Sequence, residues 1–193
     1  MINKHFFEVF LVLLTSSTVF SLELETVLVQ QRRINRESLK LLSRLLSSSI
    51  QQCLPHRKNF LLPLKSMNPH RHQMGRSLAI LQEMLQQIFS LFRARTSLDD
   101  WEQRHTEQFL LELHQQLEYL EMLLKSEAEQ KKGTLSNENL RLQVKIYFQR
   151  IRDYLENQEY CSCAWAIVHA EIHRCLFFVF RLTGMLSKQE MYP

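Results

Sequence analysis

Four cysteines are the first candidates for chemistry in this sequence of 193 residues: Cys53, Cys161, Cys163 and Cys175. In an oxidising compartment cysteines form disulfides, and four of them allow three complete pairings that sequence arithmetic does not decide. Cys161 and Cys163 lie closer together than the C-x-x-C spacing of redox motifs. We expect one of these two to pair with Cys53. A bridge that closes a loop of about 110 residues stabilises a protein by roughly 4–5 kcal/mol in the chain-entropy model.

His169 and His173 are the next candidates, because histidines one helical turn apart can bind a metal ion. The sequence H-A-E-I-H differs from the H-E-x-x-H zinc motif, since Glu171 stands second after the first histidine. We therefore interpret both histidines as solvated or partner-facing and predict no metal site. The spacing reveals no nucleophile–base–acid arrangement and no GxGxxG or GxxxxGKS/T loop, so neither an enzyme nor a nucleotide cofactor is indicated.

The composition indicates what kind of scaffold positions these residues. The chain has 24 Lys and Arg against 20 Asp and Glu, a net charge of +4, and is 45% hydrophobic. A chain of this length has on average roughly 13 Gly and 10 Pro. It contains 3 and 4, too few for the turns of a sandwich, barrel or doubly wound sheet. The cations form no long run, so nucleic-acid binding is not indicated.

The N-terminus has the pattern of a secretory signal peptide. A short basic region precedes an apolar stretch at Phe6–Leu14. After it, Val19 and Ser21 are small or modest in size, as a cleavage site requires at its −3 and −1 positions. The apolar stretch is shorter than the ~18 residues of a membrane span, which predicts cleavage and no stable membrane insertion. We expect residues 1–21 to be removed and residues 22–193 to form one secreted, extracellular domain.

Apolar residues recur at alternating three- and four-residue spacing in five segments, and each segment predicts an amphipathic helix. The predicted helices cover about 27–47, about 76–93, a segment that begins near Leu98, a segment through 140–155, and about 165–186. The first carries Leu39, Leu42 and Leu46 on one side, and the third begins with an S-x-x-D capping box at 97–100. The last contains Cys175 in its apolar stripe, so we expect a buried free thiol there.

The connection between the first two helices is much longer than the others. It spans about 48–75, and its prolines, Pro55, Pro63 and Pro69, prevent a regular helix. It also exceeds the 2–8 residues of an antiparallel turn, so the two helices it joins can run parallel. We therefore predict an all-α fold: an up-up-down-down bundle of five helices with a long first crossover loop, the architecture of helical cytokines.

Four sequence blocks, in order, resemble those of type I interferons. The letters C-S-C-A-W at 161–165 are similar to the signature at the start of the family's last helix. The other blocks begin at Cys53, Glu83 and Tyr147, and the resemblance covers about 36–186. It implies a secreted monomer that bridges the two chains of the interferon-α/β receptor and starts antiviral signalling through Janus kinases and STAT proteins.

The same resemblance has implications for the cysteines. The family disulfide maps onto Cys53–Cys163, which leaves Cys161 and Cys175 as additional cysteines. A second family bridge is missing, because Glu25 and Leu123 stand where its two cysteines would be. This joint absence resembles the delta subtype, the short trophoblast interferons of some mammals.

Helix geometry predicts which side of the last helix faces outward. The stripe through Trp165, Ile172 and Val179 forms its core side, so the opposite positions point away from the bundle. These positions are Ala170, His173, Arg174, Phe177 and Arg181, with His169 and Phe178 at the edges of the stripe. Arginine beside aromatic side chains is the composition of a protein-binding hot spot.

The resemblance assigns receptor contacts to particular positions. It implies that the high-affinity receptor chain contacts Leu54, Arg57, Ala170, Arg174 and Phe178. Phe89, in the second helix, lies toward the low-affinity chain. His169 and His173 replace residues that are often Arg and Met, and they make contact at those positions sensitive to pH near 6.

A secreted amphipathic lipid-binding protein is the alternative function, because amphipathic helices also suit apolar ligands and membrane surfaces. Phe177, Phe178 and Phe180 concentrate near the C-terminus, as such a function would favour. A lipid-binding protein would require neither the Cys53–Cys163 bridge nor the matched blocks. Liposome flotation beside a receptor reporter assay distinguishes the two classes.

Overall fold

The computed structural model describes residues 25–44, 50–65, 67, 74–95, 100–130 and 137–191. Two predictions fall outside these ranges: the signal peptide at 1–21, and the capping box at 97–100, whose first three residues are not described. The described chain is helical throughout its long elements, and no strand occurs within it. The prediction of an all-α protein is therefore confirmed.

The five long helices lie where the apolar periodicity predicts them. The first covers residues 25–44, and the others are α3 (Met74–Arg93), α4 (Asp100–Gln130), α5 (Asn137–Asn157) and α6 (Ser162–Met191). The crossover was expected to contain no regular helix, but it includes two short helical segments: the four-residue α2 (Ile50–Cys53) and the 3₁₀ turn η1 (Leu54–His56). Pro55 lies in the first turn of η1, where its missing N–H costs no hydrogen bond.

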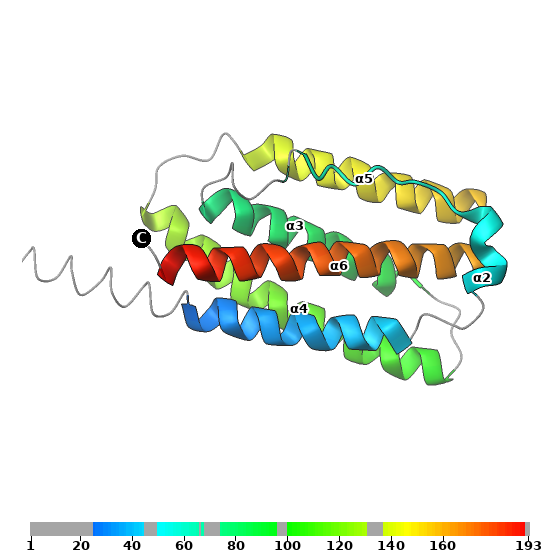
Figure 1. Ribbon diagram of the computed structural model, residues 1–193, viewed down its shortest axis with the longest axis horizontal. Coiled ribbons are helices and arrows are strands. Elements are labelled where there is room, and N and C mark those ends of the chain that lie inside the picture. The colour runs from blue at the N-terminus through cyan, green and yellow to red at the C-terminus, as the bar shows by residue number, and fades with distance from the viewer. Residues whose placement is uncertain are drawn as a thin grey trace, which may run out of the picture.

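The helices form the predicted bundle with a long overhand crossover. The first helix and α3 run in the same direction, whereas α4 and α6 run opposite to them (Figure 1). The helix α5 returns along the outside of the bundle, parallel to α3. The helix α3 contacts α4, α5 and α6, and therefore occupies the centre of the fold.

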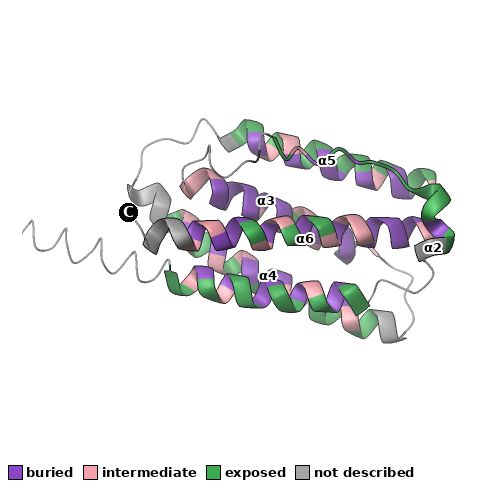
Figure 2. Ribbon diagram, viewed as in Figure 1, coloured by how far each residue is buried: buried purple, intermediate pink, exposed green. Residues whose placement is uncertain are grey.

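One continuous apolar core joins all these helices. Figure 2 shows the buried residues on the sides of the helices that face one another. Aromatic side chains fill its centre, and the Phe92 and Phe109 rings meet edge to face with centroids 4.9 Å apart. The five largest side chains with almost no exposed surface are Tyr147, Phe60, Phe92, Phe109 and Phe148. The aromatic stripe of α3 thus links α4 to the rest of the bundle.

The inward side of the first helix differs from the prediction. Leu42 is buried as expected, but Leu39 is only half-buried, and Leu46 lies outside the described residues. Three polar residues, Gln31, Asn35 and Ser38, are buried on this side together with Leu28, Ile34, Leu41 and Leu42. Polar residues occupy part of the buried side, so the spacing of apolar residues marks that side incompletely. The predicted stripe was therefore drawn through the half-buried Leu39.

A polar seam between the first helix and α4 pairs two of the buried polar side chains, Gln31 and Ser38. The Gln31 amide nitrogen donates to the Gln116 amide oxygen at 2.7 Å, and the Gln116 amide nitrogen donates to the Ser38 hydroxyl at 3.2 Å. The Ser38 hydroxyl in turn donates to the Glu112 carboxylate at 3.1 Å. Burial of polar groups is tolerated where they pair in this way.

The crossover is held against α5 and α6. The Tyr154 hydroxyl donates to the carbonyl oxygen of His56 at 3.0 Å, and the Phe60 and Tyr154 rings pack edge to face at 5.2 Å. The short α2 and η1 also contact α6. These contacts fix the residues that follow Cys53 beside the start of the last helix.

Within the described residues, the segment Ser162–Ser187 of α6 is long and apolar enough to span a membrane by length and composition. In the bundle, 56% of the most apolar 18-residue stretch of this segment is buried. Such burial is typical of the core helix of a helical bundle, where an apolar helix packs on several neighbours.

Candidate functional site

The disulfide joins Cys53 to Cys163, across a sequence separation of 110 residues. Of the two partners that sequence arithmetic left open, the structure therefore selects Cys163, as the family resemblance implied. Cys161 is a free, exposed thiol and Cys175 is a free, buried one. The prediction for Cys175 is confirmed, and the bridge brings η1 to the N-terminal end of α6.

The bridge brings η1 against α6, and both parts carry exposed residues that the sequence predicted as contacts. Leu54 is 52% exposed and Arg57 is also exposed, and both follow the bridged Cys53 directly. On α6, Arg174 and Phe177 are exposed, while Ala170 and His173 are half-buried. We call this set the outer face: Leu54, Arg57, Ala170, His173, Arg174 and Phe177.

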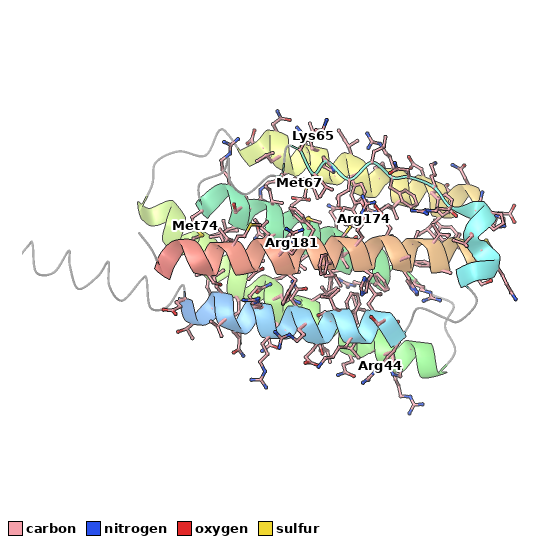
Figure 3. All side chains as sticks on the ribbon, in the orientation of Figure 1. Arg44, Lys65, Met67, Met74, Arg174 and Arg181 are labelled. Carbon is pink, nitrogen blue, oxygen red and sulfur yellow. A yellow bond between two sulfur atoms is a disulfide. The ribbon has the colours of Figure 1, made fainter. Side chains whose placement is uncertain are left out.

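Figure 3 shows how the arginines of α6 are arranged. Arg174 and Arg181 are two helical turns apart and lie on the same side of the helix. Both side chains are exposed, as helix geometry predicted. Spacing along a helix was sufficient to find them, because an outward position on a regular helix depends only on the helical period.

Arg174 is supported by two residues behind it that sequence reasoning did not identify. Its guanidinium lies 3.5 Å from a carboxylate oxygen of Glu171, one turn earlier on α6. The Tyr147 hydroxyl, from α5, donates to the same carboxylate oxygen at 2.5 Å and lies 3.1 Å from the Cys175 sulfur. The available signal was a tyrosine within the apolar stripe of α5, because a buried phenol requires a hydrogen-bond partner.

The environment of this cluster shifts two of its pKa values. Burial raises the pKa of the Tyr147 phenol well above its ordinary range, and the neighbouring Cys175 and Glu171 raise it further. Burial also raises the pKa of the Cys175 thiol to about 12. Both groups therefore stay protonated at neutral pH, and Cys175 has no nucleophilic thiolate with which to react.

His169 contradicts the prediction that it is solvated or partner-facing. Its side chain is 2% exposed, and its ring stacks on the Phe92 ring with centroids 5.4 Å apart and planes 9° apart. A guanidinium nitrogen of Arg95 lies 3.4 Å from its Nε2 atom, and the same guanidinium lies over the Trp165 ring. His169 is thus a packing residue between α3 and α6, because its flat ring fits the aromatic core at the edge of the stripe.

Two other predicted contact residues are only partly accessible. Phe178 is half-buried on α6 and packs against the apolar core. Phe89 is half-buried on α3, and its ring lies 6.3 Å from the His114 ring of α4. Phe89 therefore belongs to the side of the bundle formed by α3 and α4, apart from the outer face.

The phenylalanines near the C-terminus do not form one exposed apolar surface. Phe177 is 50% exposed, Phe178 packs on the core, and the Phe180 ring lies beneath the guanidinium of Arg32 at 4.9 Å. Single exposed apolar residues are normal in proteins. The concentration of phenylalanines that favoured a lipid-binding function is therefore divided among three environments.

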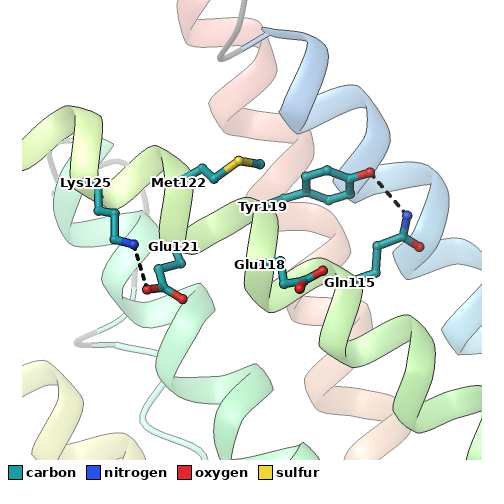
Figure 4. Close-up of a pocket in the computed structure, with 6 residues that line it drawn as sticks. All are labelled: Gln115, Glu118, Tyr119, Glu121, Met122 and Lys125. Atoms are coloured by element: carbon teal, nitrogen blue, oxygen red, sulfur yellow. Dashed lines mark hydrogen bonds and ion pairs between the residues drawn. The ribbon is translucent and has the colours of Figure 1, made fainter.

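A shallow hollow on α4 is lined by a mixture of charged, polar and apolar side chains. It has a volume of about 400 Å³ and is lined by residues of that single helix: Gln115, Glu118, Tyr119, Glu121, Met122 and Lys125 (Figure 4). The Lys125 ammonium pairs with the Glu121 carboxylate at 3.1 Å. Among the residues that the structure describes, no three His, Cys, Asp or Glu side chains gather as a metal site would require.

The bundle, its crossover and its disulfide define a helical cytokine. A family profile described as the interferon alpha/beta domain matches residues 27–186. Because this match covers most of the sequence, the chain belongs to the interferon alpha/beta family. It is accordingly an interferon cytokine and not an enzyme.

Individual relatives agree with the family match. The chain is 74% identical to interferon epsilon of Sus scrofa over the full length of both proteins. It is 68% identical to interferon epsilon of Homo sapiens, over 98% of this chain and 91% of the relative. It is 38% identical to interferon alpha-17 of Homo sapiens, over 81% of this chain and 82% of the relative. The Sus scrofa and Homo sapiens relatives with the higher identities are named epsilon, whereas the absent second bridge suggested the delta subtype.

Proposed function

We propose that the chain is a secreted monomer that bridges the two chains of the interferon-α/β receptor and thereby starts Janus-kinase and STAT signalling. Family membership supports the receptor as the partner, since the resemblance implies this receptor for type I interferons. The proposal uses two separate surfaces, because one ligand must contact two receptor chains at the same time.

The outer face is the surface that we assign to the high-affinity chain. The observation that carries this assignment is the Cys53–Cys163 bridge, which fixes Leu54 and Arg57 beside α6. The outer face that we propose thus combines Leu54 and Arg57 of the crossover with Arg174 of α6, although the two bridged cysteines are 110 positions apart in the sequence. A preformed surface of this kind binds with less loss of conformational entropy than a free loop would.

The contact residues that we propose follow the exposure in the structure. Leu54, Arg57 and Arg174 form the exposed centre of the outer face, and Ala170 and His173 contribute their accessible parts. Phe178 contributes only its exposed edge. His169 acts through packing, so it is removed from the proposed contacts.

The side formed by α3 and α4 is the surface that we assign to the low-affinity chain. Phe89 lies there, half-buried beside His114. Replacement of this phenylalanine should lower signalling while the affinity for the high-affinity chain stays unchanged. Separate surfaces produce this separation of effects, because each receptor chain contacts different residues.

A reporter assay on cells that lack one or the other receptor chain tests the proposal. We expect the refolded mature chain to activate an interferon-responsive reporter only where both receptor chains are present. Binding of the isolated high-affinity chain should persist in the Phe89→Ala variant. Equal activation in cells without the receptor would refute the proposal.

A further inference from the structure

The outward side of the first helix carries a row of cations that the receptor proposal does not use. This helix lies beside α6 in Figure 1, and its Arg32 contacts Phe180 of α6. We call this row the basic strip: Arg32, Arg33, Arg36, Lys40 and Arg44. All five side chains are exposed. Figure 3 labels Arg44, at the C-terminal end of the described first helix.

Two arginines of the strip are held in fixed positions. The Arg32 and Arg36 guanidiniums lie 4.9 and 5.9 Å from the centroid of the same Phe180 ring. Arg32 also lies against Gly184, where an added Cβ atom would be 3.5 Å from the guanidinium carbon. A guanidinium that rests on an aromatic ring keeps its N–H donors available at its edge.

The charges of the strip are largely uncompensated. Within the described residues, only Lys40 of this row forms an ion pair, with Glu37 at 2.9 Å. The Lys40 hydrogen bond lowers the pKa of the Glu37 carboxyl, and the charges of Arg36 and Arg33 lower it further. The strip therefore presents a concentrated positive field around one carboxylate.

The exposed charges of α4 are closer to balance. Its described part exposes the carboxylates of Glu107, Glu118 and Glu121 against the cations Arg104 and Lys125. The basic strip, with its exposed cations around Glu37, is therefore more strongly charged than α4. A row of charges of one sign attracts oppositely charged partners to that side of a protein.

We propose that the basic strip binds an extended sulfated polysaccharide. Arg32, Arg36, Lys40 and Arg44 recur every four residues, so they form a row that rises about 6 Å per step and about 18 Å in total while it winds by about 40° per step around the helix. A linear chain with sulfate groups along its length can contact such a row at several points. Guanidiniums bind anions of this geometry with two parallel hydrogen bonds.

Features of the strip disfavour other anionic macromolecules. Single-stranded nucleic acids bind strongly where exposed aromatic rings stack on bases, but the Phe180 ring is covered by Arg32 and Arg36. Membrane surfaces bind helices with a continuous apolar side beside the cations. On the described outward side of the first helix, Val29 is a large apolar residue that is 59% exposed and stands among polar and charged side chains.

Binding of the full mature chain to immobilised heparin, by surface plasmon resonance at about 0.15 M salt, tests the proposal. The strip variant is Arg32→Gln with Arg36→Gln, and the control is Arg93→Gln with Lys145→Gln, which removes two exposed cations elsewhere. We expect the strip variant to lose at least tenfold in affinity and the control to lose less than twofold. Equal losses, or no binding by the unaltered chain, would overturn the proposal.

Further arms keep the test decisive. Arg33→Gln with Arg44→Gln removes two cations of the strip that do not pack on Phe180. This second variant should show the same loss of heparin affinity, and it replaces the first variant in the test if the first one does not fold. Desulfated heparin should not bind. Tighter, strip-dependent binding of single-stranded DNA or phosphatidylserine vesicles than of heparin would overturn the assignment to a polysaccharide. Arg174→Ala should leave heparin binding unchanged, so failure of this inference is distinguishable from failure of the receptor proposal.

Discussion

Arg174 shows how a surface side chain depends on groups behind it. An exposed arginine has several rotatable bonds, and its ordering on binding costs conformational entropy. The Glu171 carboxylate at 3.5 Å restricts the guanidinium, and the buried Tyr147 hydroxyl holds that carboxylate in place. The outer face is therefore partly ordered before any partner arrives, which favours binding.

Truncation of two outer-face residues should weaken receptor binding without unfolding the protein. Arg174→Ala and Leu54→Ala should each lower affinity for the high-affinity chain by more than about 1 kcal/mol, roughly fivefold in Kd. Both side chains are exposed, so the melting temperature should change little. Surface plasmon resonance checks the affinities, with Arg93→Ala on α3 as a control. Near-normal binding by both variants would place the receptor surface elsewhere.

The two free thiols should react very differently. Cys161 is exposed, whereas burial raises the pKa of the Cys175 thiol to about 12. A thiol reacts as its thiolate, so the folded protein at pH 8 should incorporate iodoacetamide at Cys161 alone. Mass spectrometry of peptides checks the labelled position. Denaturant should expose Cys175 and add a second label, and rapid labelling of Cys175 in the folded protein would contradict the packing described above.

At the scale of single residues, sequence patterns predicted exposure better than they predicted partners. The helical period correctly placed Arg174 and Arg181 outside and Cys175 inside. It failed for His169, which is buried by a ring stack with Phe92 from another helix. The contact between Tyr147 and Glu171 likewise joins two helices. Such contacts depend on how helices cross, and a one-dimensional pattern does not contain that information.

The positions of the helices were predictable because the spacing of apolar residues indicates both where a helix runs and which side of it is buried. The exception is the inward side of the first helix, where Gln31, Asn35 and Ser38 are buried. Gln31 pairs with Gln116 and Ser38 pairs with Glu112, both on α4, whereas the buried Asn35 amide has no hydrogen-bond partner among the described residues. Polar residues were expected to face solvent, and only the packed arrangement reveals that Gln31 and Ser38 pair across the two helices.

The seam between the first helix and α4 should make stability depend on pH. Burial raises the pKa of the Glu112 carboxyl above its ordinary value of 4.5, although the Ser38 hydrogen bond opposes this. The folded state therefore holds the proton more tightly than the unfolded state does. Stability contributed by this proton is present below pH 4.5 and is lost as the pH rises through the raised folded-state pKa.

Glu112→Gln should remove this dependence while the amide oxygen still accepts the Ser38 hydrogen bond. We expect the variant to have a higher melting temperature than the unaltered protein at pH 7. The difference should vanish below about pH 4.5, where the carboxyl is protonated in both states. Thermal unfolding followed by circular dichroism at several pH values checks this. A constant difference at all pH values would show that charge is not the cause.

At the scale of the whole molecule, the N-terminal pattern leads to a prediction about the mature chain. If residues 1–21 are a cleaved signal peptide, the secreted protein should begin near Leu22. It should carry no N-glycan, because none of its asparagines begins an N-x-S/T sequence. N-terminal sequencing and treatment with N-glycosidase check both points. Retention in a membrane fraction or a mass shift after treatment would contradict them.

The disulfide links the stability of the bundle to the geometry of the outer face. It joins the crossover to α6 across 110 residues, and in the chain-entropy model a closed loop of this size contributes roughly 4–5 kcal/mol. Its loss also releases η1 from its fixed position beside α6. A variant without the bridge should therefore lose stability and, independently, lose affinity for the high-affinity chain.

Replacement of both bridged cysteines, Cys53→Ala with Cys163→Ala, tests this without leaving an unpaired partner. We expect the free energy of unfolding to fall by about 2–5 kcal/mol, the usual effect of losing a native disulfide. Cys161→Ser should change neither stability nor binding, because that thiol is free and exposed. Chemical denaturation and peptide mapping check these results. If mapping of the unaltered protein instead found Cys53 joined to Cys161, the start of α6 would be fixed differently and the outer face would have to be redrawn.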